Sequence, residues 1–245
     1  MKRIGVWFKT LYYHLLAWKC SKNAHLLSPK QTVKKALTEG KSIIRFGDGE
    51  FILMSGAGIH YQEPNKPLQK NLSNILKTYI ENPDESNYIL CMPNQFLSCN
   101  GFKLSKKRVW VSSWAKTRYI FKTKYDLNIE YGDAFLFANG NEDTYSTLWK
   151  DKEYVVFVHN NKKYFDFFIE RYNKKGLFVK VPEKNSFSDI SRIFTEITAS
   201  IQFPQETVVL LSAGPTSKVL VDRLSNEGVL SIDTGHCWDF PLEKI

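Results

Sequence analysis

The sequence has few cysteines and no long hydrophobic run, and both features restrict the class of protein. Its four cysteines, Cys20, Cys91, Cys99 and Cys237, form no Cys-x-x-Cys pair. Their spacing is typical of neither a zinc site nor a disulfide framework, so we expect reduced, buried thiols in a cytoplasmic protein. The apolar run near the start is too short and too polar to span a bilayer, and no small-residue cleavage site follows it.

The sequence also lacks the common glycine-rich phosphate motifs. The stretch 213–217 reads Ala-Gly-Pro-Thr-Ser, without the lysine and the full glycine spacing of a Walker loop, and it does not match G-x-G-x-x-G. This disfavours a classical P-loop enzyme. There is also no internal repeat and no low-complexity segment.

The composition is that of an ordinary globular protein. The chain has 245 residues, of which 43% are hydrophobic and 24% charged, which suffices for one large domain or two small ones. Its net charge of +9 favours anionic partners such as nucleic acid, phosphorylated small molecules or an anionic membrane. The charge alone does not choose among them.

Short apolar segments alternate with helical patterns along most of the chain. This alternation predicts βαβ units and an α/β fold, Rossmann-like, with a mostly parallel sheet flanked by helices. The predicted strands are 42–46, 88–92, 154–158, 177–181, 207–211 and 229–232. The main predicted helices are 29–40, 51–55, 67–79, 162–172, 188–200 and 216–226.

Residues 2–19 form a predicted amphipathic helix, and we assign residues 1–24 to it and residues 25–245 to the main domain. Two interpretations stay open. Aromatic residues beside lysine and arginine are typical of a helix in a membrane interface, but such a helix also packs on its own domain or on a second subunit in a homo-oligomer. Its apolar face contains Ile4, Trp7, Phe8, Leu11, Tyr12, Leu15, Leu16 and Trp18, with Lys2, Lys9 and Tyr13 opposite.

A basic, aromatic segment covers residues 105–125. It is a candidate nucleic-acid surface, but it matches no named binding motif. We therefore favour a solvated basic helix with an aromatic inner face, and we do not expect nucleic acid as a partner.

The stretch Arg45-Phe46-Gly47-Asp48-Gly49-Glu50 follows a short apolar strand. Gly49 places no side chain between the two carboxylates, so Asp48 and Glu50 can converge on one hard cation such as Mg²⁺ or Mn²⁺. The competing interpretation is a solvated acidic turn.

Two further loops follow predicted strands and should meet the first at the carboxyl edge of the sheet, where ligands bind. Gly214 and Thr216 lie at the start of a helix, where free N–H groups favour phosphate. His236 follows the last strand and can bind a metal or carry a proton. Together these loops indicate metal-assisted transfer from a diphosphate donor.

The blocks at 45–50, 211–216 (Leu-Ser-Ala-Gly-Pro-Thr) and 232–236 (Ile-Asp-Thr-Gly-His) resemble those of GT-D-type glycosyltransferases, once a domain of unknown function. Residues 182–187 (Pro-Glu-Lys-Asn-Ser-Phe) resemble a fourth block, and the resemblance covers about residues 29–240. Family members resemble enzymes that extend O-linked glycans on bacterial surface adhesins. Two segments depart from the family pattern: Phe137-Ala138-Asn139-Gly140 replaces Ser-Arg-Pro, and residues 158–161 lack a glycine-rich pattern.

The resemblance implies an Asp-x-Glu metal motif in a nucleotide-sugar domain. Asp48 and Glu50, with His236, would hold Mn²⁺ or Mg²⁺ against the diphosphate of a UDP-sugar and serve catalysis. Further donor-site residues would be Arg45, Gly47, Asn185, Gly214 and Thr216.

We therefore expect a cytoplasmic hexosyltransferase, with a site at the inner face of the membrane as one option. It would transfer a hexose, with glucose as the first candidate, to a growing glycan on a surface protein or lipid carrier. The general base stays open among Asp143, Asp233, His236 and Asp239. The alternatives are a metal-dependent phosphohydrolase or nuclease and a non-catalytic basic module that binds nucleic acid.

Overall fold

The computed structural model describes residues 2–243, with side chains from Gly5 onward. The side chains of Lys2, Arg3 and Ile4, part of the predicted amphipathic helix, therefore lie outside the described residues. The helices are α1 (Lys2–Leu16), α2 (Pro29–Glu39), α3 (Asp48–Met54), α4 (Lys66–Glu81), α5 (Asn94–Ser98), α6 (Gly101–Ser105), α7 (Arg108–Lys124), α8 (Glu142–Tyr145), α9 (Lys162–Tyr172), α10 (Ile190–Ser200) and α11 (Pro215–Asn226).

Within the described residues, eight strands form one sheet in the order β1-β4-β3-β2-β8-β7-β5-β6, and all their pairings are parallel. This confirms the predicted α/β fold class. The strands are β1 (His25–Leu26), β2 (Ser42–Arg45), β3 (Tyr88–Met92), β4 (Glu130–Asp133), β5 (Tyr154–His159), β6 (Lys175–Lys180), β7 (Thr207–Leu211) and β8 (Ser231–Asp233).

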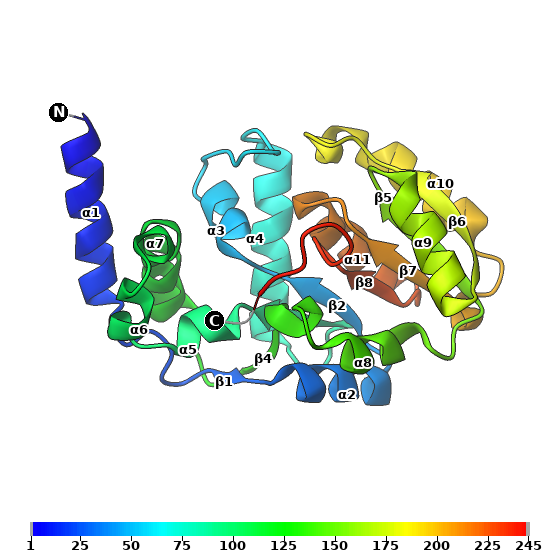
Figure 1. Ribbon diagram of the computed structural model, residues 1–245, viewed down its shortest axis with the longest axis horizontal. Coiled ribbons are helices and arrows are strands. Elements are labelled where there is room, and N and C mark those ends of the chain that lie inside the picture. Colours follow the sequence, from blue (N-terminus) through cyan, green and yellow to red (C-terminus); the bar gives the residue numbers. More distant parts are fainter. Residues whose placement is uncertain (1, 244–245) are drawn as a thin grey trace.

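Helices cover both faces of the sheet, so its central strands are buried on both sides (Figure 1). Successive strand residues point to opposite faces: Ile44 packs into the cluster with α4, α10 and α11, whereas Ile43 packs into the cluster with α2 and α9. Burial on both faces explains the continuous apolar strands of the sequence.

The strand order reverses direction between β2 and β8. From β2 the chain proceeds to β3 and β4 on one side, whereas β8, β7, β5 and β6 lie on the other. Ligands of open parallel sheets bind outside the carboxyl ends of strands at such a point. The loops after β2, β7 and β8 begin there, and these loops with their flanking residues contain the predicted site residues other than Asn185.

Two short strands escaped prediction, and one predicted helix begins earlier than expected. β1 has two residues, and β4 reads Glu-Tyr-Gly-Asp, which shows no hydrophobic pattern. The acidic stretch after β2 is not a free turn, because Asp48 and Glu50 already lie in the first turn of α3. The predicted boundary at residue 51 is therefore wrong by one turn.

Close packing between β4 and β3 makes Gly132 sensitive to substitution. A Cβ atom there would lie 2.5 Å from Cys91 Sγ and 2.9 Å from Ile89 Cγ2, and both side chains are buried. We expect Gly132→Ala to lower the free energy of unfolding by about 1–3 kcal/mol, measured by urea denaturation. Gly5→Ala is the control: no atom lies within 4 Å of its new Cβ, and alanine favours the helix. Equal stability of the two variants would contradict this account.

Candidate functional site

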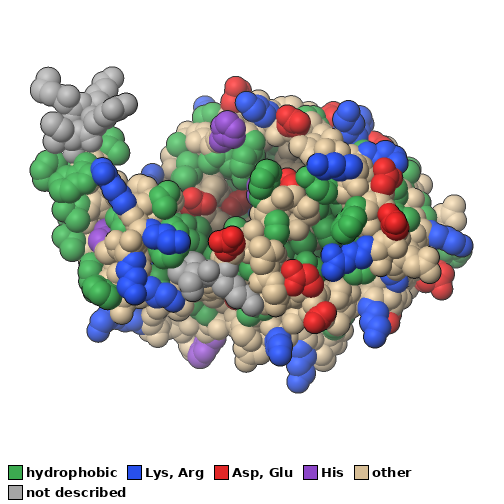
Figure 2. All heavy atoms as spheres, in the orientation of Figure 1, with side chains coloured by type: hydrophobic (Ala, Val, Ile, Leu, Met, Phe, Trp, Pro, Cys, Tyr) green, Lys and Arg blue, Asp and Glu red, His purple; other side chains and the backbone are tan. Residues whose placement is uncertain are grey.

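The loops at the carboxyl ends of β2, β7 and β8 enclose a cavity of about 500 Å³. This volume lies in the range of small-molecule sites. Figure 2 shows the cavity's face of the molecule, with carboxylates inside a central hollow. Of the eight predicted site residues, the cavity is lined by Arg45, Gly47, Asp48, Glu50, Gly214 and His236.

Asp48 and Glu50 lie on the first turn of α3 but have different surroundings. Glu50 Oε2 accepts a hydrogen bond from the Gly47 backbone N–H at 2.8 Å, and the side chain is almost fully buried. Asp48 Oδ1 accepts from the adjacent Gly49 N–H at 3.0 Å, and no cationic side chain pairs with this carboxylate among the described residues. Burial, together with the negative charge of Glu50, raises the pKa of Asp48. Asp48 is therefore the carboxylate with free capacity to bind a cation.

Lys218 bridges two carboxylates at the bottom of the cavity. Its Nζ lies 3.1 Å from Glu50 Oε1 and 3.0 Å from Asp233 Oδ2, and all three side chains are buried. Burial alone would lower the pKa of Lys218, but the charges of Asp233 and Glu50 raise it above its ordinary value. Lys218 is therefore a fixed cation, and it links α11 to α3 and to the end of β8.

Arg45 is held at the end of β2 by contacts with the β8 loop. Its backbone N–H donates to Asp233 Oδ2 at 3.2 Å, and its Nη1 donates to the Thr234 carbonyl at 3.1 Å. The guanidinium also lies over the Phe137 ring. Its buried Nε has no partner in the described residues, and the residue lines the cavity.

Gly235 is required for this position of Arg45. It has a φ of +53°, and a Cβ would lie 2.6 Å from Arg45 Nη2. The glycine next to His236 thus allows the guanidinium to approach the backbone of the β8 loop.

Asn185 and Thr216 do not line the cavity, although both were predicted to contact the donor. Asn185 Oδ1 accepts from the Glu63 N–H at 2.8 Å, which fixes the loop that carries Tyr61. Thr216 is fully buried, and its hydroxyl lies 2.7 Å from that of Ser186, which lines the cavity. Both side chains therefore stabilise residues next to the cavity without lining it themselves.

His236 pairs with Asp239 at the rim of the cavity. His236 Nδ1 lies 3.3 Å from Asp239 Oδ1, and the His236 side chain is 57% exposed. Burial would raise the pKa of Asp239, but the hydrogen bond and charge of His236 hold it below its ordinary value. Of the four candidate general bases, only these two line the cavity with a free path to solvent, because Asp233 is fully buried and Asp143 lies elsewhere.

The predicted metal set is only partly assembled. The part of the chain that the structure describes contains no group of three or more His, Cys, Asp or Glu side chains able to hold a metal ion. Both oxygens of Glu50 are already engaged. Mg²⁺ often needs only one or two carboxylates when substrate phosphates supply the other ligands. The residues therefore fit a cation held by Asp48, beside Glu50, together with a phosphorylated ligand.

Several cavity residues escaped prediction. Lys218 lies near the start of α11 in the sequence Thr-Ser-Lys-Val-Leu-Val, and all six of these residues are buried. A lysine just before an apolar run was the sequence feature that could have identified it. His159, at the end of β5, is buried and accepts from the Asn161 N–H at 3.0 Å, while burial lowers its pKa. One wall is aromatic: Phe96 and Trp114 stack with ring centroids 4.2 Å apart.

Removing the buried cation should destabilise the protein in a pH-dependent way. We expect Lys218→Met to lower the free energy of unfolding by about 3 kcal/mol or more at pH 8, because Glu50 and Asp233 are left buried without their partner. Without the ammonium, the two neighbouring buried carboxylates repel each other while they are ionised, so we expect a larger loss at pH 8 than at pH 5.

The wild type should not show this pH dependence. The folded-state pKa of Lys218 is raised. Its contribution to the free energy of unfolding is therefore complete below about pH 10.5 and constant between pH 5 and 8. Urea denaturation at both pH values measures the effect. The exposed Lys163→Met is the control, expected within about 0.5 kcal/mol of wild type. A pH-independent loss in Lys218→Met would contradict the ion bridge.

Solved structures with a similar fold are known. The fold superposes with a TM-score of 0.73 on a structure described as a domain of unknown function 1792 with a distinct glycosyltransferase fold, covering 94% of this chain and 82% of that chain at 22% identity. A glycosyltransferase from Streptococcus sanguinis matches with a TM-score of 0.66, over 88% of this chain and 82% of that one, also at 22% identity.

Sequence comparison gives the family. A probable glycosyl transferase, Gly, of Streptococcus gordonii is 26% identical over 86% of this chain and 32% of its own length. The glycosyltransferase GlyD of Streptococcus pneumoniae serotype 4 is 22% identical over 84% of this chain and 26% of its own length. The chain thus spans about a third or less of these relatives. The model of the glycosyltransferase GT-D fold matches residues 43–240, and the chain belongs to this family.

Proposed function

We propose that this chain transfers a hexose, with glucose as the first candidate, from a UDP-sugar to a hydroxyl group of a growing glycan. The observation that carries the proposal is the Asp48 carboxylate, which lines the cavity of a GT-D-family chain without a cationic partner among the described residues. The acceptor glycan would be carried by a surface protein or by a lipid, as the resemblance to adhesin-modifying enzymes suggests.

The charge distribution suits a diphosphate donor. Arg45 and the Gly214 loop offer positive charge and backbone N–H groups at one side of the cavity. Asp48, beside Glu50, would hold Mn²⁺ or Mg²⁺, which neutralises the charge on the departing diphosphate. Lys218 holds Glu50 in place and adds a fixed positive charge beside the proposed cation site.

The reaction breaks the bond between the anomeric carbon and the UDP oxygen while the acceptor hydroxyl bonds to that carbon. The hydroxyl proton must be removed, and the His236–Asp239 pair is the group best placed to receive it. The aromatic wall of Phe96 and Trp114 offers an apolar surface for a sugar ring. The four buried, free cysteines fit a cytoplasmic enzyme.

A panel of UDP-sugars read by UDP release, with and without Mn²⁺, tests the reaction directly. We expect Asp48→Asn to reduce release by orders of magnitude, because a metal supplies several kcal/mol of transition-state stabilisation. The fold should survive: the raised pKa of Asp48 means that its ionised form costs stability at pH 7. Asp143→Asn, outside the cavity, is the control. Full activity of Asp48→Asn, or of wild type in EDTA, would refute the proposal.

Replacing His236 separates its role from that of the metal ligand. We expect His236→Ala to lower turnover by roughly 10²-fold or more, as is typical for loss of a general base, without changing the urea midpoint, because the side chain is largely exposed. Asp239→Asn should lower turnover in the same direction. His25→Ala serves as the control, because His25 is an exposed histidine of β1 that does not line the cavity. Wild-type kinetics in His236→Ala would remove it from the mechanism.

A further inference from the structure

Helix α1 is anchored to the rest of the protein through its less apolar side. Tyr13 packs on Tyr119 of α7 with ring centroids 5.0 Å apart, and buried His14 lies 2.7 Å from the Ser105 hydroxyl. Buried Arg118 of α7 donates to the Ala17 carbonyl at 2.8 Å and to the Cys99 carbonyl at 2.8 Å. The helix therefore has a defined position, and Figure 1 shows it at one end of the molecule.

The opposite side of α1 exposes most of its large apolar side chains. Trp7 is 50% exposed, Phe8 60%, Tyr12 58% and Leu15 58%. Phe102 of the adjacent helix α6 is 67% exposed. We call these five residues the α1 surface. An apolar surface of this kind, contiguous along a helix, usually marks an interaction site, and Figure 2 shows hydrophobic atoms gathered along this helix.

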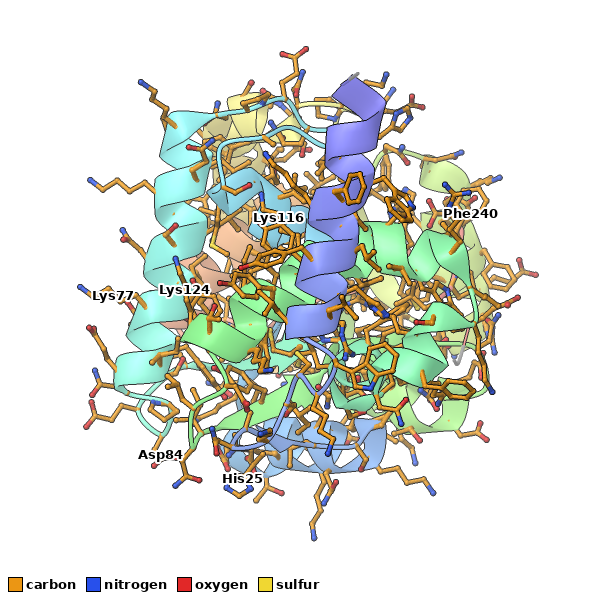
Figure 3. All side chains as sticks on the ribbon, turned by 90° about the vertical axis from the view of Figure 1, so that its left-hand side faces the viewer. His25, Lys77, Asp84, Lys116, Lys124 and Phe240 are labelled. Atoms are coloured by element: carbon orange, nitrogen blue, oxygen red, sulfur yellow. The ribbon has the colours of Figure 1, made fainter. Side chains whose placement is uncertain are left out.

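The helices that form and adjoin the α1 surface carry basic residues and no acidic residue. The sequence contains no Asp or Glu in residues 1–38 or 86–125, which include all of α1, α5, α6 and α7. Figure 3 looks at this side of the molecule, with α1 in front and Lys116 and Lys124 of α7 labelled. Exposed basic residues near α1 include Lys9, Lys19, Lys103, Lys106, Lys107 and Arg108.

We propose that the α1 surface docks on an anionic lipid bilayer, with α1 lying in the headgroup region. Apolar aromatic side chains flanked by lysine, without acidic residues, are the chemistry of interfacial helices. A second copy of this chain is a poorer occupant, because it would bring like charges together. None of the described helices has the length and apolar character of a membrane span. The proposal goes beyond glycosyl transfer and does not depend on it.

Vesicle flotation of the full chain tests the apolar contribution. We expect wild type to float with vesicles of phosphatidylglycerol and phosphatidylcholine, and at least tenfold less with phosphatidylcholine alone. Trp7→Gln/Phe8→Gln should weaken binding at least tenfold. Phe167→Gln/Phe203→Gln is the matched control, since Phe167 (55%) and Phe203 (62%) are equally exposed but lie outside the acid-free segments. Urea midpoints verify that neither pair unfolds the protein.

A second pair of variants tests the charge contribution. Each lysine near an anionic surface contributes roughly fivefold to binding, so Lys106→Gln/Lys107→Gln should lose at least tenfold. Lys162→Gln/Lys163→Gln, an exposed pair with the same spacing on α9, should bind as wild type. Salt should weaken binding only in part, because apolar insertion is not screened.

Two results would overturn the proposal. One is unchanged vesicle binding in both the Trp7→Gln/Phe8→Gln and the Lys106→Gln/Lys107→Gln variants. The other is a lipid-free dimer of wild type in sedimentation velocity that the Trp7→Gln/Phe8→Gln variant abolishes, which would make a second copy the occupant. UDP release is measured alongside, and a variant that loses vesicle binding but keeps UDP release separates docking from catalysis.

Discussion

The buried contact of Lys218 with Glu50 and Asp233 holds the cavity together. It joins the first turn of α11, the first turn of α3 and the end of β8, three segments far apart in the chain. Two carboxylates buried beside each other would repel, and each would carry a desolvation cost. The ammonium offsets both effects, and this leaves Asp48 as the acidic group with free capacity. The two carboxylates of one Asp-x-Glu motif thus differ because Lys218, 168 positions after Glu50, pairs with Glu50 and not with Asp48.

Local sequence patterns predicted the scaffold well where burial is symmetric. β3 and β7 are fully buried apolar runs with the predicted limits, because burial on both faces leaves an unbroken hydrophobic signal. β4 carries Glu130, Gly132 and Asp133, and no local pattern distinguishes it from a loop. It is a strand because β3 and β1 offer it backbone partners, and that is a long-range cause.

The site was predictable in position but less so in contacts. A strand-end motif predicts where Asp48, Gly214 and His236 lie, since parallel strands bring their carboxyl ends to one edge. It does not predict which side chains turn inward. Thr216 and Asn185 have the right neighbourhood, yet their oxygens are used by Ser186 and by the Glu63 backbone. Only the packed loops decide this, because each buried polar atom must find a partner.

Helix α7 contacts both the cavity and helix α1. Trp114 lines the cavity, and Tyr119 and Arg118 of the same helix hold α1. A membrane bound to the α1 surface, which faces away from α7, would be separated from the aromatic wall by α1 and α7. Docking would hold an acceptor glycan that is attached to a lipid close to the protein, whereas a glycan on a dissolved protein would gain nothing from docking. If docking and transfer are coupled in this way, anionic vesicles carrying the acceptor should raise the rate of UDP release, and the Trp7→Gln/Phe8→Gln variant should lose only that increase.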